Sequence, residues 1–399
     1  MPDSLRIGLL THSVNPRGGV VHTLELARAL HGLGHHVTVF APAQASQRFF
    51  RALPHEAALV PVGPAPADLA DLVADRIGAF VAHLGARLRH ERFDVLHAHD
   101  GIGGNALADL VDAGVIDGFV RTVHHLDPFT DARLAAWQTR SVLRARQVLC
   151  VSRTWCETLE RDFAVSAALV SNGVDCTRFG RVPDTHDTAL AHRLGLRPGA
   201  PLFVAVGGVE ARKNSVRLLE AFLQLRATQP GAQLVIAGGA SLLDHSDCAR
   251  AFHALAASAG LVPEVGGALV LTGALPDAEM PALFRLADAL LMPSLREGFG
   301  LVVLEALACG TPVVVSNMAP FTEYLGDTVA AGHAVYADPL DPASLALAMA
   351  RAVEPARAAA LARAVPPVCL RHGWDASAAR HVALYRAQAA LARAALPAH

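Results

Sequence analysis

Short runs of apolar residues alternate with longer segments whose apolar residues recur at helical spacing. The first run, residues 5–11, predicts a buried strand, and residues 20–33 predict an amphipathic helix that ends at Gly32 and Gly34. Residues 37–40 predict the next strand. Because helix-length segments separate the strands, the pattern predicts βα units and a mostly parallel sheet.

The alternation continues on both sides of one irregular segment. Residues 179–201 contain prolines and glycines among mostly polar residues, and we expect the linker between two domains there. Residues 374–393 predict one long helix. The predicted fold class is α/β, with two Rossmann-like, doubly wound parallel-sheet domains in residues 1–180 and 200–372 and a terminal helical segment at 373–395. Further strands are predicted at 94–97, 119–124, 148–152, 169–171, 202–206, 234–237, 269–272, 289–292 and 312–316.

The composition supports two buried cores. Of the 399 residues, 52% are hydrophobic and 18% are charged, which argues against a disordered chain. The formal net charge is −2, which is not the charge of a nucleic-acid-binding protein. No apolar run is long enough for a membrane span, and the N-terminus lacks the pattern of a signal peptide. We therefore expect a cytoplasmic protein.

The cysteines and histidines show no spacing that is typical of a metal site. The six cysteines contain no CxxC pair, so we expect reduced thiols. Histidine pairs occur at 35–36 and 124–125, and His97 and His99 are two residues apart. None of them has zinc-type spacing to a cysteine or to a second histidine pair, so we expect no metal ion.

One lysine stands out among the basic residues. Lys213 is the only lysine beside 33 arginines, and it follows Arg212 at the predicted start of a helix after strand 202–206. Two cations at a helix N-terminus oppose the helix dipole, which makes sense if an anion binds there. A diphosphate fits, since arginine binds it in bidentate fashion and lysine adds a compact charge. A solvated charge pair is the alternative.

Two loops after strands of the first half are candidate binding sites. Gly18 and Gly19 follow strand 5–11 and open a helix, so their amides could face an anion, although a tight turn explains them equally well. This is not a GxGxxG loop, which weakens a dinucleotide reading. His124 ends strand 119–124 and could bind a sugar hydroxyl, or it could be a buried histidine with satisfied hydrogen bonds.

A second candidate site follows strand 289–292. Glu297 lies in the loop after this strand, and Glu305 lies on an otherwise apolar helix. A carboxylate on such a helix is costly unless it is paired or binds a hydroxyl-rich ligand. Gly298 and Gly300 expose amides that could bind a phosphate. The alternative is a capping glutamate and a glutamate at the edge of the core.

The segment EGFGLVVLE, residues 297–305, resembles the E-x7-E element of the retaining family 4 glycosyltransferases, which have the GT-B fold. Other segments resemble the same family in the same order: RGGVVHTLELARALHGLGHHVTVFAP, SNGVDCTRF, VAVGGVEARKNSVRLLEAF, RLADALLMPSLREGFG and ACGTPVVVSNMAPFTEYLGD. The resemblance implies an acceptor-side domain and a nucleotide-sugar-binding domain that face a central cleft. It also implies that the terminal helix crosses back to the first domain.

The resemblance further implies a reaction and a role for each candidate residue. A sugar would move from a nucleotide diphosphate sugar to a hydroxyl acceptor with retained configuration, and the departing phosphate would take the acceptor's proton. The implied catalytic residues are Glu297 on the sugar hydroxyls, Lys213 and Arg212 on the diphosphate, and His124 in the sugar pocket. The implied donor-binding residues are Glu305 on the ribose, the amides of Gly298, Phe299 and Gly300, and Gly18 and Gly19 on the phosphate and acceptor side. No metal is expected, because the two cations neutralise the diphosphate.

Several alternatives stay open. Many relatives carry a basic residue where this chain has Gly208, which leaves the donor base (UDP, GDP or ADP) undecided. A GT-B epimerase, a phosphorylase-like enzyme and a non-catalytic sugar-nucleotide-binding protein share the predicted fold, whereas an oxidoreductase should show GxGxxG. The acceptor could be a small molecule, a glycan or a lipid. Residues 47–51 form a small basic-aromatic patch that could touch a membrane, although an ordinary helix or loop is the simpler interpretation.

Overall fold

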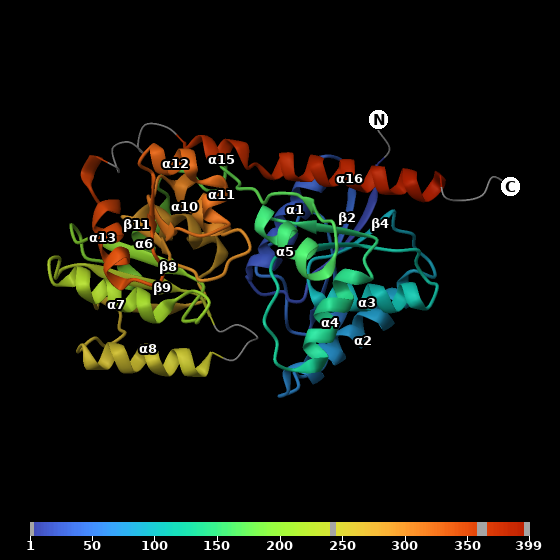
Figure 1. Cartoon of the computed structure of the whole chain (residues 1–399), viewed down its shortest axis with the longest axis horizontal. Helices are drawn as coiled ribbons and strands as arrows, with labels where there is room; N and C mark the ends of the chain where they lie inside the picture. The colour runs from blue at the N-terminus through green and yellow to red at the C-terminus, as the bar shows by residue number, and fades with distance from the viewer. Residues whose placement is uncertain (1–3, 240–244, 357–364, 395–399) are drawn as a thin grey trace. The chain divides into compact units, whose positions relative to one another are not determined.

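The computed structural model describes residues 4–239, 245–356 and 365–394 (Figure 1). The chain divides into two compact units. Unit 1 consists of Met1–Asn172 together with Trp374–His399, and unit 2 consists of Gly173–Gly373.

Unit 1 is built on a parallel sheet, whose strands among the described residues run in the order β3-β2-β1-β4-β5-β6-β7. The order reverses between β1 and β4, where Ile7 of β1 pairs with Val37 on one side and Val95 on the other. The strands are β1 (Arg6–Leu10), β2 (His36–Ala43), β3 (Glu56–Pro61), β4 (Val95–Ala98), β5 (Val120–Val123), β6 (Gln147–Cys150) and β7 (Ala168–Leu169). The helices are α1 (Gly18–Gly32), α2 (Leu69–Arg87), α3 (Gly101–Asp112), α4 (Ala132–Leu143), α5 (Arg153–Phe163) and α16 (Trp374–Ala394).

Apolar side chains on the strands pack against helices to form the core of unit 1. Leu10 of β1 and Phe40 of β2 pack with Phe80 of α2 and Leu107 of α3, and all four are fully buried. Helix α1 packs on β1, β2 and the terminal helix α16 (Figure 1). The terminal helix therefore contributes side chains to unit 1 although unit 2 precedes it in the chain.

Unit 2 has a second parallel sheet, whose described strands run in the order β10-β9-β8-β11-β12-β13. Its core contains Phe203 of β8, Phe222 of α7, Leu234 of β9 and Leu345 of α13, each at most 1% exposed. The strands are β8 (Leu202–Val206), β9 (Gln233–Ala237), β10 (Leu269–Gly273), β11 (Ala289–Met292), β12 (Val313–Ser316) and β13 (Ala334–Ala337). The helices are α6 (Thr185–Leu194), α7 (Ser215–Arg226), α8 (Ser246–Ser258), η1 (Asp277–Glu279), α9 (Met280–Leu286), α10 (Leu301–Cys309), α11 (Phe321–Tyr324), α12 (Gly326–Ala330), α13 (Pro342–Ala352) and α15 (Pro367–Arg371).

The α/β fold class with two parallel sheets is confirmed, but residues 179–201 differ from the expected linker. They contain helix α6, which has a capping box at Asp184 and ends at Gly195 with φ +63°. Asp187 of α6 accepts a hydrogen bond of 2.5 Å from Arg285 of α9, so the helix is packed into unit 2. The chain passes from unit 1 to unit 2 earlier, between Asn172 and Gly173. Because prolines and glycines flank this helix, the sequence pattern of the segment resembles that of a loop.

The basic-aromatic residues 47–51 form a loop in unit 1. Phe49 packs against the small core cluster of Val14, Ala41 and Ala43, and Arg51 forms an ion pair with Glu25 of α1. The loop is therefore tied to the body of unit 1. Among the described residues, no helix is both long and apolar enough to cross a bilayer.

Candidate functional site

The sheet order of unit 2 explains why two separate loops meet. Strands β8 and β11 are neighbours, and the strand order reverses between them. In open α/β sheets, ligands bind at the carboxyl ends of the strands at such a reversal. The loop after β8 carries Arg212 and Lys213, and the loop after β11 carries Glu297. The topology thus brings together the cations and one of the carboxylates that the sequence predicts.

These residues form a carboxylate–cation cluster, defined here as Glu210, Arg212, Lys213 and Glu297. The Lys213 ammonium donates a hydrogen bond of 2.8 Å to Oε2 of Glu297, and Arg212 donates one of 3.2 Å to the same oxygen. Arg212 also lies 3.4 Å from Oε2 of Glu210. A single carboxylate oxygen therefore holds both cations in place.

The cluster is largely shielded from water. The side chains of Lys213 and Glu297 are 14% and 13% exposed, and that of Arg212 is 29% exposed. Burial lowers the pKa of Lys213, and the nearby Glu297 carboxylate opposes that shift. Electrostatic interactions are stronger in such a partly desolvated place than in water. An anion that entered here would meet two cations already oriented by hydrogen bonds.

Glycines make room for the lysine. Gly207 has φ +126°, and a Cβ atom there would lie 2.8 Å from Cε of Lys213. Any larger residue would therefore push the lysine stem away. Gly208 has φ +75°, and its Cβ would lie 3.2 Å from the carbonyl oxygen of Gly239. A side chain at Gly208 is thus disfavoured by both backbone conformation and space.

The loop after Glu297 is fixed by aromatic contacts. The Phe299 ring stacks on Tyr324 with centroids 4.7 Å apart, and the Tyr324 hydroxyl donates a hydrogen bond of 2.9 Å to the Phe299 carbonyl. Gly300 has φ +90°, and a Cβ there would lie 2.7 Å from the Phe321 ring. Gly298 lies between Glu297 and this aromatic contact, and its amide donates to Oε1 of Glu297 at 3.3 Å. The turn therefore holds Glu297 at the end of β11.

Glu305 lies on α10 with apolar neighbours that are buried, and it is itself 9% exposed. The expectation of a carboxylate on an otherwise apolar helix is therefore confirmed. Its assignment to a nucleotide ribose stays a prediction.

In unit 1, the predicted glycine turn and histidine come together. Helix α1 begins at Gly18 directly after Arg17, whose side chain does not cap the helix, and the first turn contains no acidic residue. A Cβ on Gly19 would lie 3.6 Å from Cδ2 of His124, so the helix start and this histidine are in contact distance. Uncapped helix N-termini favour anions. The positions of Gly18, Gly19 and His124 are thus compatible with the phosphate and sugar contacts implied for them.

His124 belongs to a larger group that we call the histidine cluster: His22, His97, His99, His124 and His381. The ring centroids of His22 and His124 are 4.5 Å apart, and those of His97 and His99 are 4.2 Å apart. His97 is hydrogen-bonded at 2.7 Å on both sides, to Tyr385 and to Thr122. Burial lowers the pKa of every member, to about 3 for His22 and about 4 for His381. These imidazoles are therefore neutral at pH 7.

From the sequence, only His124 of the histidine cluster was predicted as a site residue. In the carboxylate–cation cluster, Glu210 was not predicted. His22 and His381 lie on helices far apart in the sequence, so no local spacing links them. His97 lies near the carboxyl end of strand β4 and His99 directly follows the strand, and that position at a strand end was the available signal. Glu210 is 5% exposed within the loop that carries Arg212. In the sequence, the position of this carboxylate two residues before Arg212 was the signal that could have identified Glu210.

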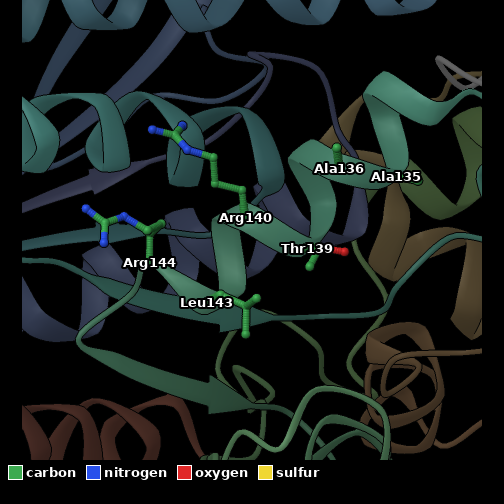
Figure 2. Close-up of a pocket in the computed structure, with 6 residues that line it drawn as sticks. All are labelled: Ala135, Ala136, Thr139, Arg140, Leu143 and Arg144. Atoms are coloured by element: carbon green, nitrogen blue, oxygen red, sulfur yellow. The ribbon is translucent and has the colours of Figure 1, made fainter.

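A third feature, on helix α4 of unit 1, contains no member of either cluster. Figure 2 shows a hollow along α4 that contains Arg140 and Arg144. Arg140 pairs with Asp109 and with Asp112, in each case at 2.7 Å, so its charge is balanced within the surface of unit 1. None of the residues predicted for the site lies in this hollow, which is lined by Ala135, Ala136, Thr139, Arg140, Leu143 and Arg144.

Comparisons with known proteins identify the family. A family model described as Glycosyltransferase Family 4 matches residues 16–178, and one described as Glycosyl transferases group 1 matches residues 188–363. The D-inositol 3-phosphate glycosyltransferase of Xylanimonas cellulosilytica is 30% identical over 401 residues, which cover 92% of this chain and 91% of that protein.

Solved structures show the same fold. The sucrose-phosphate synthase of Thermosynechococcus elongatus superposes with a TM-score of 0.78 at 21% identity, over 97% of this chain and 100% of that one. The Anabaena protein HepE in complex with UDP and glucose superposes with a TM-score of 0.76 at 18% identity, over 96% and 100% of the two chains. The chain is therefore a glycosyltransferase of family 4 with the two-domain GT-B fold.

Proposed function

We propose that this enzyme transfers a sugar from a nucleotide diphosphate sugar to a hydroxyl acceptor, with retention of the anomeric configuration and without a bound metal ion. The observation that carries the proposal is the pairing of Lys213 and Arg212 on one oxygen of Glu297, at 2.8 and 3.2 Å. Two oriented cations supply the positive charge that a diphosphate leaving group requires.

The shared carboxylate oxygen suggests how the donor binds. A diphosphate beside Arg212 and Lys213 would accept the hydrogen bonds that Glu297 now accepts. The Glu297 carboxylate would then accept hydrogen bonds from hydroxyls of the donor sugar. Charge that develops on the leaving phosphate in the transition state would face the two cations, which is where preorganised charge accelerates a reaction most.

The remaining roles follow the family pattern. We assign Glu305 to the ribose and the amides of Gly298, Phe299 and Gly300 to donor binding beside it. In unit 1, we assign Gly18 and Gly19 to the phosphate and acceptor side and His124 to the sugar. Because His124 is neutral at pH 7, it can both donate and accept a hydrogen bond. In the front-face route, the leaving phosphate takes the acceptor's proton, so the protein need not supply a nucleophile.

The comparisons suggest which substrates to try first. HepE was solved with UDP and glucose, and the Xylanimonas relative is named for D-inositol 3-phosphate. UDP-glucose with D-inositol 3-phosphate is therefore the first pair, followed by GDP- and ADP-sugars and by lipid or glycan acceptors.

The test begins with thermal unfolding in the presence of UDP, GDP or ADP, because a ligand that binds the folded state raises its stability. The nucleotide with the largest shift defines the donor for product analysis by NMR. We expect release of nucleoside diphosphate that depends on an acceptor, an unchanged anomeric configuration in the product, and no loss of rate when a chelator is present. An inverted product, or a rate that disappears with the chelator, would contradict the proposal.

A further inference from the structure

Three members of the histidine cluster converge on one point of unit 1. His22 lies on α1, His99 directly follows β4, and His124 directly follows β5. Each offers a ring nitrogen, and these nitrogens lie within 4.8 Å of one another. No local spacing rule could reveal the group, because its members come from three separate elements.

Ring nitrogens in this group are buried and lack hydrogen-bond partners. Nε2 of His22, both ring nitrogens of His99 and Nε2 of His124 are buried and have no partner among the described residues. Buried polar atoms are normally paired, because leaving them unpaired is costly. His97, in contact with His99, shows the usual arrangement with a partner on each nitrogen. In the described part of the cluster, unpaired ring nitrogens thus occur on the three converging rings and, outside that group, on Nε2 of His381.

The hydrogen bond of His22 fixes which of its nitrogens is available. Its Nδ1 lies 2.9 Å from Oδ1 of Asn172, and a carboxamide oxygen can only accept. His22 therefore carries its proton on Nδ1 and a lone pair on Nε2. Histidine ligands of metal ions are oriented in the same way, with one nitrogen on the ion and the other donating to a neighbouring oxygen.

We propose that His22, His99 and His124 form a binding site for Zn²⁺ or a similar transition-metal ion. Three neutral imidazoles suit zinc, cobalt, nickel and copper, whereas Mg²⁺ and Ca²⁺ prefer oxygen ligands. Nitrogens bound to one tetrahedral zinc ion lie roughly 3.3 Å apart, so the observed spacing requires only small rotations of the rings. Three histidines leave a fourth position for water or an anion.

The charges around the site limit what binds there. Arg121 is close enough to lower the pKa of His124 and would also repel a cation. An anion or hydroxide in the fourth position would offset that repulsion.

One consequence rests on the proposed function. His124 is assigned there to the donor sugar, so an ion that holds this ring would compete with the sugar. Zinc is then an inhibitor that a chelator reverses. The binding test below uses no substrate, so its failure is distinct from a failure of the proposed function.

The direct test is titration of the chelator-treated full chain with ZnCl₂ alone, followed by isothermal calorimetry and by metal analysis after gel filtration. We expect one tightly held zinc per chain, and at least a 10-fold loss of affinity in His22→Gln and in His99→Gln, in keeping with the loss of one ligand. His125→Gln is the matched control, because this exposed neighbour of His124 lies outside the group. It should bind as the parent does.

The absence of stoichiometric binding, or parent-like affinity in His22→Gln and His99→Gln, would overturn the proposal. If those variants fail to fold, X-ray absorption of the zinc-loaded parent decides the question. Three imidazole ligands on the ion support the site, and fewer than three contradict it.

Discussion

The two units place different chemistry at the same topological position. In unit 2, the loops after β8 and β11, at the reversal of strand order, carry the charged residues. In unit 1, the reversal lies between β1 and β4, and the histidines come from the helix after β1 and from the ends of β4 and β5. The cluster of unit 2 is charged, and its members pair with one another. The cluster of unit 1 is made of neutral imidazoles, and several of their nitrogens have no hydrogen-bond partner in the described part of the chain.

This difference in charge indicates which kind of ligand each unit is suited to bind. Fixed opposite charges exchange partners when an anion arrives, so unit 2 is suited to a diphosphate. Neutral rings with lone pairs bind hydroxyls or a metal ion, so unit 1 is suited to a sugar or to zinc. The following experiments test whether the charged cluster of unit 2 and the neutral cluster of unit 1 differ in this way.

The largest effect is expected for Lys213→Met, which keeps the apolar stem over Gly207 and removes the charge. Turnover should fall about 10²–10³-fold, the size that the loss of one preorganised transition-state contact produces. The measurement is the initial rate with the donor that thermal shifts identify. Arg217→Ala, which removes a charge on the following helix, is the matched control and should keep the parent rate. A folded Lys213→Met variant with a normal rate would refute the assigned role.

A smaller loss is expected for Glu305→Gln. The substitution keeps the size of the side chain and an acceptor oxygen but removes the charge, so a hydrogen bond donated by a ribose hydroxyl would weaken by about 1–1.5 kcal/mol. The dissociation constant of the nucleoside diphosphate should therefore rise by roughly 5–10-fold. Calorimetry on parent and variant checks this, and inorganic pyrophosphate, which has no ribose, serves as a control whose weaker binding should not change. Equal nucleotide affinity in the two proteins would remove Glu305 from the donor site.

The histidine cluster should make unit 1 sensitive to acid. An unfolded histidine takes up its proton near pH 6.5, whereas His22 and His381 have folded pKa values of about 3 and 4. Unfolding therefore takes up protons below pH 6.5, and the free energy of unfolding should fall as the pH drops from 6.5 toward 4. Each such histidine contributes up to about 1.4 kcal/mol per pH unit.

Urea unfolding followed by tryptophan fluorescence measures this slope for unit 1, because Trp137, Trp155 and Trp374 all belong to it. His381→Gln should lower the slope by about one proton. A slope that is unchanged in this variant, or no loss of stability on acidification, would show that the cluster is not buried in its neutral form.

Two glycine substitutions compare how strongly the backbone is constrained in the two units. Gly300→Ala should destabilise unit 2 by about 1–2 kcal/mol, because alanine is strained at φ +90° and its Cβ would meet Phe321. Gly18→Ala, whose Cβ would meet no atom within 4 Å, should change stability by less than about 0.5 kcal/mol. Chemical denaturation of both variants checks the pair. Equal losses would mean that the glycine turn of unit 1 is as constrained as that of unit 2.

Much of the fold could be predicted from the sequence, because most buried strands are continuous apolar runs; β8 and β11 were predicted with the bounds that the structure shows. Strand β3 was missed because most of its residues are half-buried or exposed, and strand β13 was also missed. Helix α6 was missed because its ends resemble a loop.

The candidate site, like the fold, has one part that could be predicted from the sequence and one part that could not. Lys213 and Glu297 could be predicted because each lies in the loop that follows a strand, and parallel strands end at the same edge of a sheet. The convergence of His22, His99 and His124 could not be predicted, since it depends on which strands are neighbours and on how α1 packs. The same reason explains why the sequence argument against a histidine metal site does not apply to these three rings.

The most direct measurement compares the affinity of the parent and of Lys213→Met for a nucleoside diphosphate and for the corresponding monophosphate. If the carboxylate–cation cluster binds the diphosphate, the parent prefers the diphosphate, and the variant loses most of that preference while its monophosphate affinity stays the same. A variant that keeps the parent's full preference would show that the diphosphate binds elsewhere, and the account of unit 2 would be wrong.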